Sequence, residues 1–522
     1  MCCAVIAVAT TAHAAAPPVV NHLYPAGGGR GSTVCVVPIL TGAHHGRSAK
    51  LEPWPVGVWT DCKGLKITPA QTSGQLSVQI AEDAPLGAHL IRLYTPDGAS
   101  APRMFVVGHH PEITETGPDG SEEATRLIES LPVTINGRLR HPPYHDDLGR
   151  QKWDGDADSY AVHLEAGSWL VARLHAYSIG SPIDPVLYLR DEVGHVLATN
   201  HDDRNLDPVL AYQIEKAGKY VVQVTGFAWP PSGVPGFQPV AFVGSDEAMY
   251  RLTLTTGTFG RYPFPLGVQR GRKTSVMLHG WNLNSTDRLI RYELDTTDLA
   301  AEVQHVFIGP SVIGNLLPVE VGDTPELLEV EPNDQPHLAQ PIAIPVALSG
   351  RIGAAGDVDR FFFHAAKDQK LVFRFPAIPL GLPLNGALRI EDETGKQVAE
   401  KTSPPVNRQM QWTAPADGSF TLVVGDLSGR GGDDHVYRLE ILHPVPGKGL
   451  SYADNRWQFD FYARVNAHTF RIEPGRTAQM KVSIETFDGF EAPMAPSRID
   501  MARSSWRGRR TRACSPIGIT DR

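Results

Sequence analysis

Long apolar runs and basic charge are both scarce in this chain of 522 residues. A helix that crosses a bilayer needs about 20 consecutive apolar residues, and the apolar run near the N-terminus covers only Cys2 to Thr11. The net charge is -9, which leaves no overall basic surface for nucleic acid. The sequence therefore predicts neither a transmembrane segment nor a nucleic-acid partner.

Cysteine is rare as well, with five residues in the whole sequence. Cys2 and Cys3 lie in the N-terminal apolar run and Cys514 lies close to the C-terminus, which leaves Cys35 and Cys62. Their spacing fits neither a C-x-x-C redox motif nor a zinc site. In an exported protein this pair predicts a disulfide between Cys35 and Cys62, and two buried free thiols are the alternative.

The common motifs of hydrolytic enzymes are missing. The sequence contains no H-E-x-x-H pair of zinc ligands and no G-x-S-x-G nucleophile turn. Paired loop histidines such as His109 and His110 have no regular ligand partner, so we expect them to be solvated. We therefore assign no catalytic residue.

The first residues resemble a secretory signal peptide. The apolar run precedes Ala12-His13-Ala14, a small-residue cleavage pattern, and then the break at Pro17-Pro18. We expect residues 1–16 to be removed on export. The mature protein is then expected to be secreted, periplasmic or held at the cell surface.

Short strands dominate the rest of the sequence. The chain has 50 Gly and 43 Pro residues, which lie between short apolar runs as turn residues do. Leu76 to Ile80 and Tyr220 to Val224 alternate with the period of two that a half-buried strand shows. Helical periodicity is scarce, and at about 150 residues per domain the length implies three or four domains. The pattern predicts an all-β chain of several modules.

Two internal repeats define these modules. The first repeat is an apolar segment at the start of two modules. Leu23 to Gly27 with Arg30-Gly31 recurs as Pro263 to Gly267 with Arg270-Gly271, and each copy leads into a strand. The second copy continues as His279-Gly280-Trp281-Asn282-Leu283. These residues resemble the opening of IPT/TIG-type immunoglobulin-like domains. The resemblance implies two small β-sandwiches, at residues 19–108 and 258–325.

The second repeat is acidic. Gly155-Asp156-Ala157-Asp158-Ser159-Tyr160 matches Gly356-Asp357-Val358-Asp359-Arg360-Phe361, and each copy closes on a Tyr-Arg-Leu strand that begins at Tyr250 or Tyr437. The second copy opens with Glu329-Val330-Glu331-Pro332-Asn333-Asp334. These segments resemble the bacterial pre-peptidase C-terminal (PPC) domain, a jelly-roll-like β-sandwich found beside many secreted peptidases. The resemblance implies PPC-like modules at residues 109–257 and 326–443, with a role in recognition or folding support and with calcium in some members.

The sequence after the second PPC-like module changes character. Phe470 to Ile472 and Met480 to Ile484 have the pattern of strands, which predicts an incomplete third β-sandwich over residues 444–494. Residues 495–522 are rich in arginine and lose the strand pattern, so we expect a disordered tail. We favour a truncated or frame-shifted gene end over a basic tail that binds nucleic acid.

Oxygen-bearing side chains at the start of the second PPC-like module form the strongest candidate site. Glu329, Glu331 and Asn333 alternate along a segment that Pro332 biases to an extended form, so they project to one side. Further carboxylates follow nearby without His or Cys, and hard oxygen ligands of this kind suit calcium. A solvated polar linker is the alternative. The predicted calcium ligands are Glu329, Glu331, Asn333, Asp334, Asp357 and Asp359.

The first PPC-like module carries two other acidic sets. At its entry Ile113 to Thr116 replaces the Glu-Pro-Asn segment, so we expect a weaker site, or none, from Glu112, Glu115, Asp156 and Asp158. The second set has no acidic counterpart in the other copy, and a solvated loop is an equal alternative to an ion site. Its members are Asp184, Asn200, Asp202, Asp203 and Asp207.

Taken as a whole, the sequence predicts an exported, non-catalytic protein of several modules, stabilised by calcium, that serves binding or surface assembly. Its expected partner is an extracellular protein or polysaccharide. The alternative is that these modules are the accessory region of a secreted peptidase or other hydrolase whose catalytic domain is absent from this chain.

Overall fold

The computed structural model describes most of the chain between residues 18 and 444. The described residues are 18–40, 54, 56–95, 98–115, 125–139, 144–145, 151–152, 156–203, 206–228, 245–283, 289–301, 303, 305–375, 382–402 and 409–444, together with strands at 461–465, 477–480, 482–486 and 517–520. The predicted signal peptide, residues 1–16, lies outside them.

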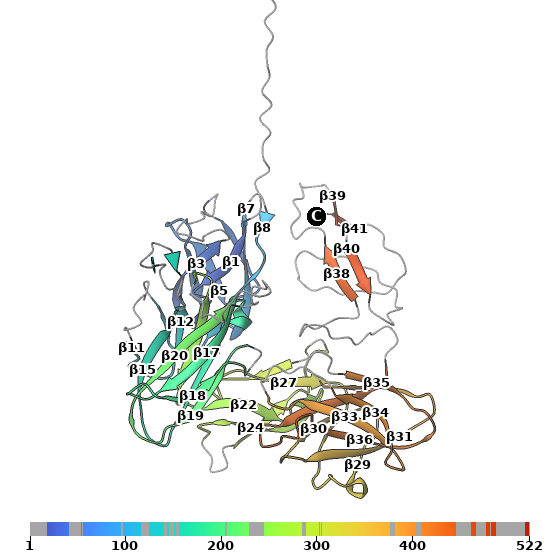
Figure 1. The fold of residues 1–522 in the computed structure, drawn as a ribbon. Helices are drawn as coiled ribbons and strands as arrows, with labels where there is room; N and C mark the ends of the chain where they lie inside the picture. The colour runs from blue at the N-terminus through green and yellow to red at the C-terminus, as the bar shows by residue number, and fades with distance from the viewer. Residues whose placement is uncertain are drawn as a thin grey trace, which may run out of the picture.

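Strands make up nearly all of the regular structure (Figure 1). The described residues contain no α-helix, and their 3-10 turns are η2 (Tyr177–Ile179) and η3 (Pro336–Leu338). The strands form successive pairs of sheets along the chain. The predicted all-β class, with β-sandwiches in tandem, is therefore confirmed. No helix among the described residues is long and apolar enough to cross a membrane.

The first immunoglobulin-like module packs two sheets face to face. Their strand orders are β1-β3-β6-β5 and β2-β9-β7-β4, with β8 beside β7. Alternate residues such as Val36, Val78, Leu93 and Phe105 point between the sheets and form one core. The strands are β1 (Val20–Tyr24), β2 (Gly27–Gly29), β3 (Thr33–Leu40), β4 (Gly57–Thr60), β5 (Leu65–Pro69), β6 (Leu76–Ile80), β7 (Gly87–Thr95), β8 (Gly98–Ala99) and β9 (Arg103–Gly108).

Cys35 and Cys62 lie in different parts of this sandwich, one on its surface and one in its core. Cys35 is exposed, because β3 turns Val34 and Val36 toward the core and Cys35 away from it. Cys62 is buried within the core. Both are free thiols, so the predicted disulfide between Cys35 and Cys62 is wrong, and the alternative of buried thiols holds for Cys62 alone.

The first PPC-like module is a sandwich of two five-stranded sheets. Their orders are β10-β12-β21-β16-β19 and β11-β15-β20-β17-β18. Each sheet begins with a parallel pair, β10 with β12 and β11 with β15. The strands are β10 (Glu112–Thr114), β11 (Arg126–Leu127), β12 (Val133–Arg138), β15 (Asp158–Leu164), β16 (Trp169–His175), β17 (Ile183–Arg190), β18 (Val196–Asn200), β19 (Val209–Gln213), β20 (Gly218–Ala228) and β21 (Met249–Thr255), with a hairpin of β13 (Tyr144–His145) and β14 (Gln151–Lys152).

The second immunoglobulin-like module is smaller. Its sheets have the orders β22-β24-β25 and β23-β27-β26. As in the first module, its second strand pairs in parallel with its last, here β23 with β27. The strands are β22 (Phe259–Phe264), β23 (Gly267–Gln269), β24 (Lys273–Trp281), β25 (Leu289–Asp295), β26 (His305–Ile308) and β27 (Leu317–Gly322).

The second PPC-like module repeats the first strand for strand. Its sheets have the orders β28-β30-β37-β32-β35 and β29-β31-β36-β33-β34, again with a parallel pair at one edge of each. Gly350 pairs with Tyr437 as Gly137 pairs with Tyr250, so the two copies can be compared position by position. The strands are β28 (Glu326–Leu328), β29 (Gln340–Pro341), β30 (Val346–Arg351), β31 (Val358–Ala365), β32 (Lys370–Arg374), β33 (Gly386–Asp392), β34 (Gln397–Thr402), β35 (Gln409–Thr413), β36 (Gly418–Asp426) and β37 (Val436–Leu442).

Four further strands are described after residue 444. β38 (Phe461–Val465) pairs with β40 (Val482–Thr486), and β39 (Thr477–Met480) pairs with β41 (Ile517–Thr520). The other residues of the expected third sandwich and of the tail lie outside the described part of the chain.

Candidate metal centre

The predicted ligands of the second PPC-like module come together beside the start of β31. Carboxylate oxygens of Glu329, Glu331 and Asp359 lie within 4.8 Å of one another, and so do those of Glu331, Asp334 and Asp357. Because Glu331 belongs to both groups, the five carboxylates form one continuous acidic cluster. We call these five residues together with Asn333 the acidic cluster below.

Main-chain donors hold several of these side chains in place. The amide of Arg351, at the end of β30, donates to Glu329 Oε2 at 2.6 Å, and the amide of Gly353 donates to Asp357 Oδ2. The amide of Asn333 donates to Glu331 Oε2 at 2.8 Å. The segment after β28 and the residues at and after the end of β30 therefore fix one oxygen of each of these three carboxylates.

Three buried oxygens of the cluster accept no hydrogen bond from the described residues. They are Asn333 Oδ1, Asp357 Oδ1 and Asp359 Oδ1. Asn333 is completely buried, and its side-chain nitrogen donates to Glu329 Oε1 at 3.2 Å, which leaves its oxygen as an unused acceptor. A buried oxygen without a partner is costly, so this arrangement favours a bound cation.

The pKa values of three carboxyl groups in the cluster are raised, first by burial and then by neighbouring carboxylates. Burial, reinforced by the charge of Glu329, raises the pKa of Asp359 to about 10, although Tyr437 donates a hydrogen bond to Asp359 Oδ2. Burial and then the neighbouring Asp334 raise the pKa of Asp357 to about 6. Burial also raises the pKa of Glu331. Within the described part of the chain no basic side chain forms an ion pair with the cluster, so protons or a cation must balance its charge.

The first copy reproduces only part of this cluster. Glu115 accepts the amide of Arg138 at 2.8 Å as Glu329 accepts that of Arg351, and Tyr250 donates to Asp158 as Tyr437 donates to Asp359. Asp156 accepts the amide of Ala157 at 2.8 Å. Among the described residues no three carboxylates of this copy lie within 4.8 Å of one another. The segment that would complete the comparison, residues 116–124, lies outside them.

Glu112 forms an ion pair instead of contributing to the predicted ion site. Arg251 Nη2 donates to Glu112 Oε1 at 2.7 Å, and Asn136 Nδ2 donates to Glu112 Oε2 at 2.8 Å. The ion pair neutralises Glu112, so its assignment to an acidic ion site is wrong. Its counterpart in the second copy is Glu326, which pairs with Arg438.

The second acidic set of the first PPC-like module is dispersed. The carboxylate of Asp207 accepts three main-chain amides around η2, at 2.8 to 3.1 Å, and Asp203 Oδ1 accepts Arg261 Nη1 at 3.1 Å. Asp202 pairs with His201 at 2.8 Å. Asp184 Oδ1 and Asn200 Oδ1 are buried and accept no hydrogen bond from the described residues, and burial raises the pKa of Asp184. No three described carboxylates of this set lie within 4.8 Å of one another, and an ion site there stays a prediction.

A buried arginine lies at each module junction and was not predicted from the sequence. Arg251 in β21 lies against Gly27 of the first immunoglobulin-like module, and Arg438 in β37 lies against Gly267 of the second, where any side chain on the glycine would overlap the guanidinium. Arg438 donates to Glu440 Oε1 at 2.7 Å and lies 3.1 Å from Glu320 Oε1. These arginines could have been found from the sequence, because each is a charged residue inside an otherwise apolar strand, Met249–Thr255 or Val436–Leu442.

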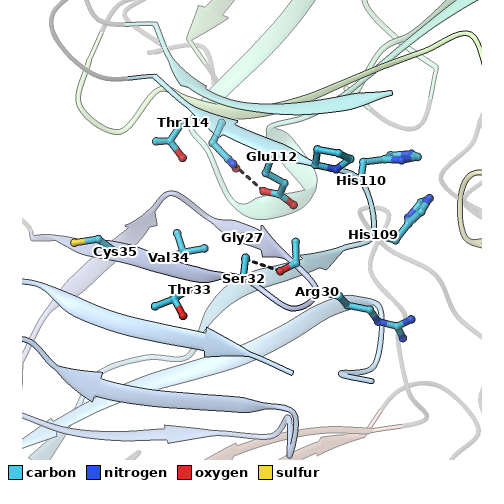
Figure 2. Close-up of a pocket in the computed structure, with 13 residues that line it drawn as sticks. Gly27, Arg30, Ser32, Thr33, Val34, Cys35, His109, His110, Glu112 and Thr114 are labelled. Carbon is cyan, nitrogen blue, oxygen red and sulfur yellow. Dashed lines mark hydrogen bonds between the residues drawn. The ribbon is translucent and has the colours of Figure 1, made fainter. Parts of the chain in front are cut away.

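A cavity of about 650 Å³ lies between the first immunoglobulin-like and PPC-like modules (Figure 2). His109 and His110 line it and are partly buried rather than solvated, and burial lowers the pKa of His109 to about 4. His110 Nε2 lies 3.1 Å from the carbonyl of Gly314, and Arg30 Nε donates to the carbonyl of Ala84 at 2.6 Å. Because these groups and Glu112 already have partners within the protein, the acidic cluster is the better candidate site.

Comparisons with known proteins found similarity at the level of solved structures. No family model and no curated protein matches the chain. The PPC domain of a collagenase from Bacillus anthracis is similar with 14% identity and a TM-score of 0.17, over 22% of this chain and 99% of that domain. A periplasmic inhibitor of g-type lysozyme from Aeromonas hydrophila has 10% identity and a TM-score of 0.16, over 22% of this chain and 95% of the inhibitor. A glycan-utilisation protein from Bacteroides ovatus, solved with a mixed-linkage heptasaccharide, has 9% identity and a TM-score of 0.12, over 43% of this chain and 70% of that protein.

Proposed function

We propose that this chain is an exported, non-catalytic binding or surface-assembly protein that calcium stabilises at the acidic cluster. The first pair of modules below is the first immunoglobulin-like module with the first PPC-like module, and the second pair is the second of each. Calcium at the acidic cluster stabilises the second pair. The observation that supports this proposal is the convergence of five carboxylates and the buried Asn333 without a basic counter-charge among the described residues. Calcium takes six to eight oxygen ligands, and the two carboxylate groups share Glu331, so side-chain oxygens of the cluster would form such a shell together with main-chain or water oxygens. No nitrogen or sulfur ligand is present among them, which disfavours zinc.

Calcium would also connect two modules. Glu329 and Glu331 lie in the segment that follows the second immunoglobulin-like module, whereas Asp357 and Asp359 lie at the start of β31 inside the sandwich. The guanidinium of Arg351, whose amide holds Glu329, lies 5.6 Å from the ring centre of Phe264 in the other module. A bound cation would therefore fix the entry segment and favour one orientation of the pair.

The test is thermal unfolding of the full chain in 10 mM calcium and in a chelator. If the dissociation constant is roughly 10⁻⁴ to 10⁻³ M, as in other extracellular modules, calcium should add about 1.4 to 2.7 kcal/mol to the stability of the second pair. The double variant Asp357→Asn, Asp359→Asn should lose this response, and in the chelator it should be at least as stable as the wild type because the carboxylates no longer repel one another.

The matched control is the double variant Asp156→Asn, Asp158→Asn in the first copy, which should keep the full calcium response. The proposal fails if calcium leaves the unfolding midpoint unchanged, or if it raises the midpoint of the Asp357, Asp359 variant as much as that of the wild type.

A further inference from the structure

One face of the first immunoglobulin-like module carries large apolar side chains in solvent. Trp59 in β4, Tyr94 in β7 and Met104 in β9 have 42%, 48% and 42% of their surfaces exposed, although neighbours such as Leu93 and Phe105 are buried. These three strands lie side by side in the order β9-β7-β4, and β7 lies at the upper end of the blue module in Figure 1. We call this surface the aromatic face. A contiguous exposed apolar patch of this kind is a candidate binding surface.

The Tyr94 ring lies flat on the sheet. Gly57 is the cross-strand partner of Tyr94, and a side chain at Gly57 would overlap the Tyr94 ring. The glycine thus lets one face of the ring rest on the backbone while the other face meets solvent. Trp59 lies two residues along β4, and diagonal neighbours of this kind are about 7 to 8 Å apart. Two sugar units of one chain can span such a pair of rings.

Arg92 neighbours both aromatic side chains and gives the face a positive charge. It is the cross-strand partner of Trp59 and lies two residues before Tyr94 on β7. Its Nε donates to the carbonyl of Ser100 at 2.8 Å, which fixes the side chain, and its terminal nitrogens donate to no described residue. The outward positions of β4, β7 and β9 carry no carboxylate, so the face is complementary to an anion.

We propose that the aromatic face binds an acidic polysaccharide. Pyranose rings stack on Trp59 and Tyr94 through their C–H groups, which match the negative faces of the aromatic rings. A uronate carboxylate accepts two hydrogen bonds from Arg92, the geometry that a guanidinium favours. This inference rests on the proposed binding function and names the class of partner and the surface that recognises it.

The second immunoglobulin-like module provides an internal control. Aligning the parallel pairs β2 with β9 and β23 with β27 places Pro318 at the position of Met104 and Phe307 at that of Leu90. Phe307 is 62% exposed, so this module also has an exposed apolar side chain. Its described sheet, β23-β27-β26, has no counterpart of β4 and therefore no second ring beside an arginine. Only the first module should bind.

The experiment is calorimetric titration of the full chain with hexamers of galacturonate, with hyaluronan hexamers and with neutral glucose hexamers. Both acidic ligands should bind, and the neutral ligand should bind about tenfold more weakly or not at all. Trp59→Ala and Tyr94→Ala should each weaken acidic binding roughly tenfold, as loss of a central aromatic anchor does. Arg92→Gln should remove the preference for acidic over neutral ligands, and Phe307→Ala should change nothing. Thermal melts of each variant verify that it folds.

Absence of binding to both acidic ligands would overturn the proposal, and that is also the result expected if the aromatic face binds a folded protein instead. Equal affinity for neutral and acidic ligands, or acidic binding that survives Trp59→Ala and Tyr94→Ala, would overturn it as well. The titrations are repeated in calcium and in a chelator, because the aromatic face lies in a different module from the acidic cluster. A failed calcium melt with intact oligosaccharide binding therefore rejects the calcium proposal alone, and the reverse result rejects this one alone.

Discussion

The two pairs of modules share one architecture but bury very different amounts of charge at their junctions. In the first pair Arg251 meets a single carboxylate, Glu112, and the amide of Asn136. In the second pair Arg438 is buried and Arg374 is half-buried, and three carboxylates lie beside them. These carboxylates are Glu320, Glu326 and Glu440. The same backbone thus places one carboxylate beside the buried arginine in the first pair and three in the second.

The acidic clusters differ in the same direction. Because Glu115 occupies the position of Glu329, counting along the sequence places Pro118 at the position of Pro332 and Gly117 at that of Glu331. Gly120 likewise replaces Asp334. Asp119 occupies the position of Asn333, so the six positions hold five carboxylates in the second copy and four in the first. We therefore expect the stability of the second pair to depend more strongly on calcium and on pH than that of the first pair.

Removal of the junction arginines should give the largest difference between the pairs. Arg438→Met leaves three carboxylates, of which Glu320 and Glu440 are buried, with one remaining arginine, and loss of one partner from a buried ionic group costs about 3 to 5 kcal/mol. Arg251→Met leaves only Glu112 uncompensated, so we expect a loss of about 2 kcal/mol. Hydrogen exchange of β37 and of β21 in mild denaturant measures the two losses separately.

A methionine at either position keeps the volume of the side chain, so packing changes little in either variant. Equal losses, or a larger loss at Arg251, would show that the second junction does not depend on its arginine more than the first. In that case the different numbers of carboxylates at the two junctions would make no difference to stability.

The pH dependence of the second pair should show an effect of intermediate size. Burial raises the pKa of Glu320 to about 6, above its ordinary value of 4.5. The folded state therefore binds more protons than the unfolded state between about pH 4.5 and 6, so stability rises as the pH falls through this window and is lowest above it. The expected gain is about 2 kcal/mol. The charged groups that face Glu320 are His305, Glu326, Arg374, Arg438 and Glu440.

Glu320→Gln should abolish this part of the pH dependence, measured by hydrogen exchange of β27 in saturating calcium so that the acidic cluster stays ionised. The first pair supplies the control, because Val106 occupies the position of Glu320 and β9 should show no such trend. An unchanged pH profile in the Glu320→Gln variant would assign the effect to another group.

Much of this architecture could be predicted from the sequence, because sheet formation and the repeats depend on local patterns. Alternation with a period of two predicted the strands, and the spacing of Glu329, Glu331 and Asn333 around Pro332 predicted which side chains converge. Asp357 and Asp359 could be added because the same short motif recurs in both copies. Each of these inferences uses residues that lie close together along the chain.

The two errors have different causes. Glu112 was predicted to be an unpaired acid, but it forms an ion pair with Arg251, which is 139 positions away, so long-range packing decides this case. Cys35 and Cys62 have a spacing that permits a disulfide, but β3 turns Cys35 outward. The alternation of side chains along β3 carries that information, and the spacing of the cysteines does not.

The smallest expected difference comes from one hydroxyl group. Tyr24 and Phe264 occupy the same position in the two immunoglobulin-like modules, and each ring packs under an arginine of its PPC-like module, Arg138 at 4.0 Å and Arg351 at 5.6 Å from the ring centres. The Tyr24 hydroxyl also donates to the carbonyl of Asn136 at 3.1 Å, a bond that Phe264 cannot make. Tyr24→Phe should therefore cost about 1 kcal/mol, the net value of one hydrogen bond, and should appear as faster hydrogen exchange in β12 with β30 unchanged. Tyr94→Phe, which removes an exposed hydroxyl, is the matched control and should leave β12 unaffected. If Tyr24→Phe has no more effect than this control, the first junction depends on the arginine and the ring alone, and the two junctions differ only in their buried charge.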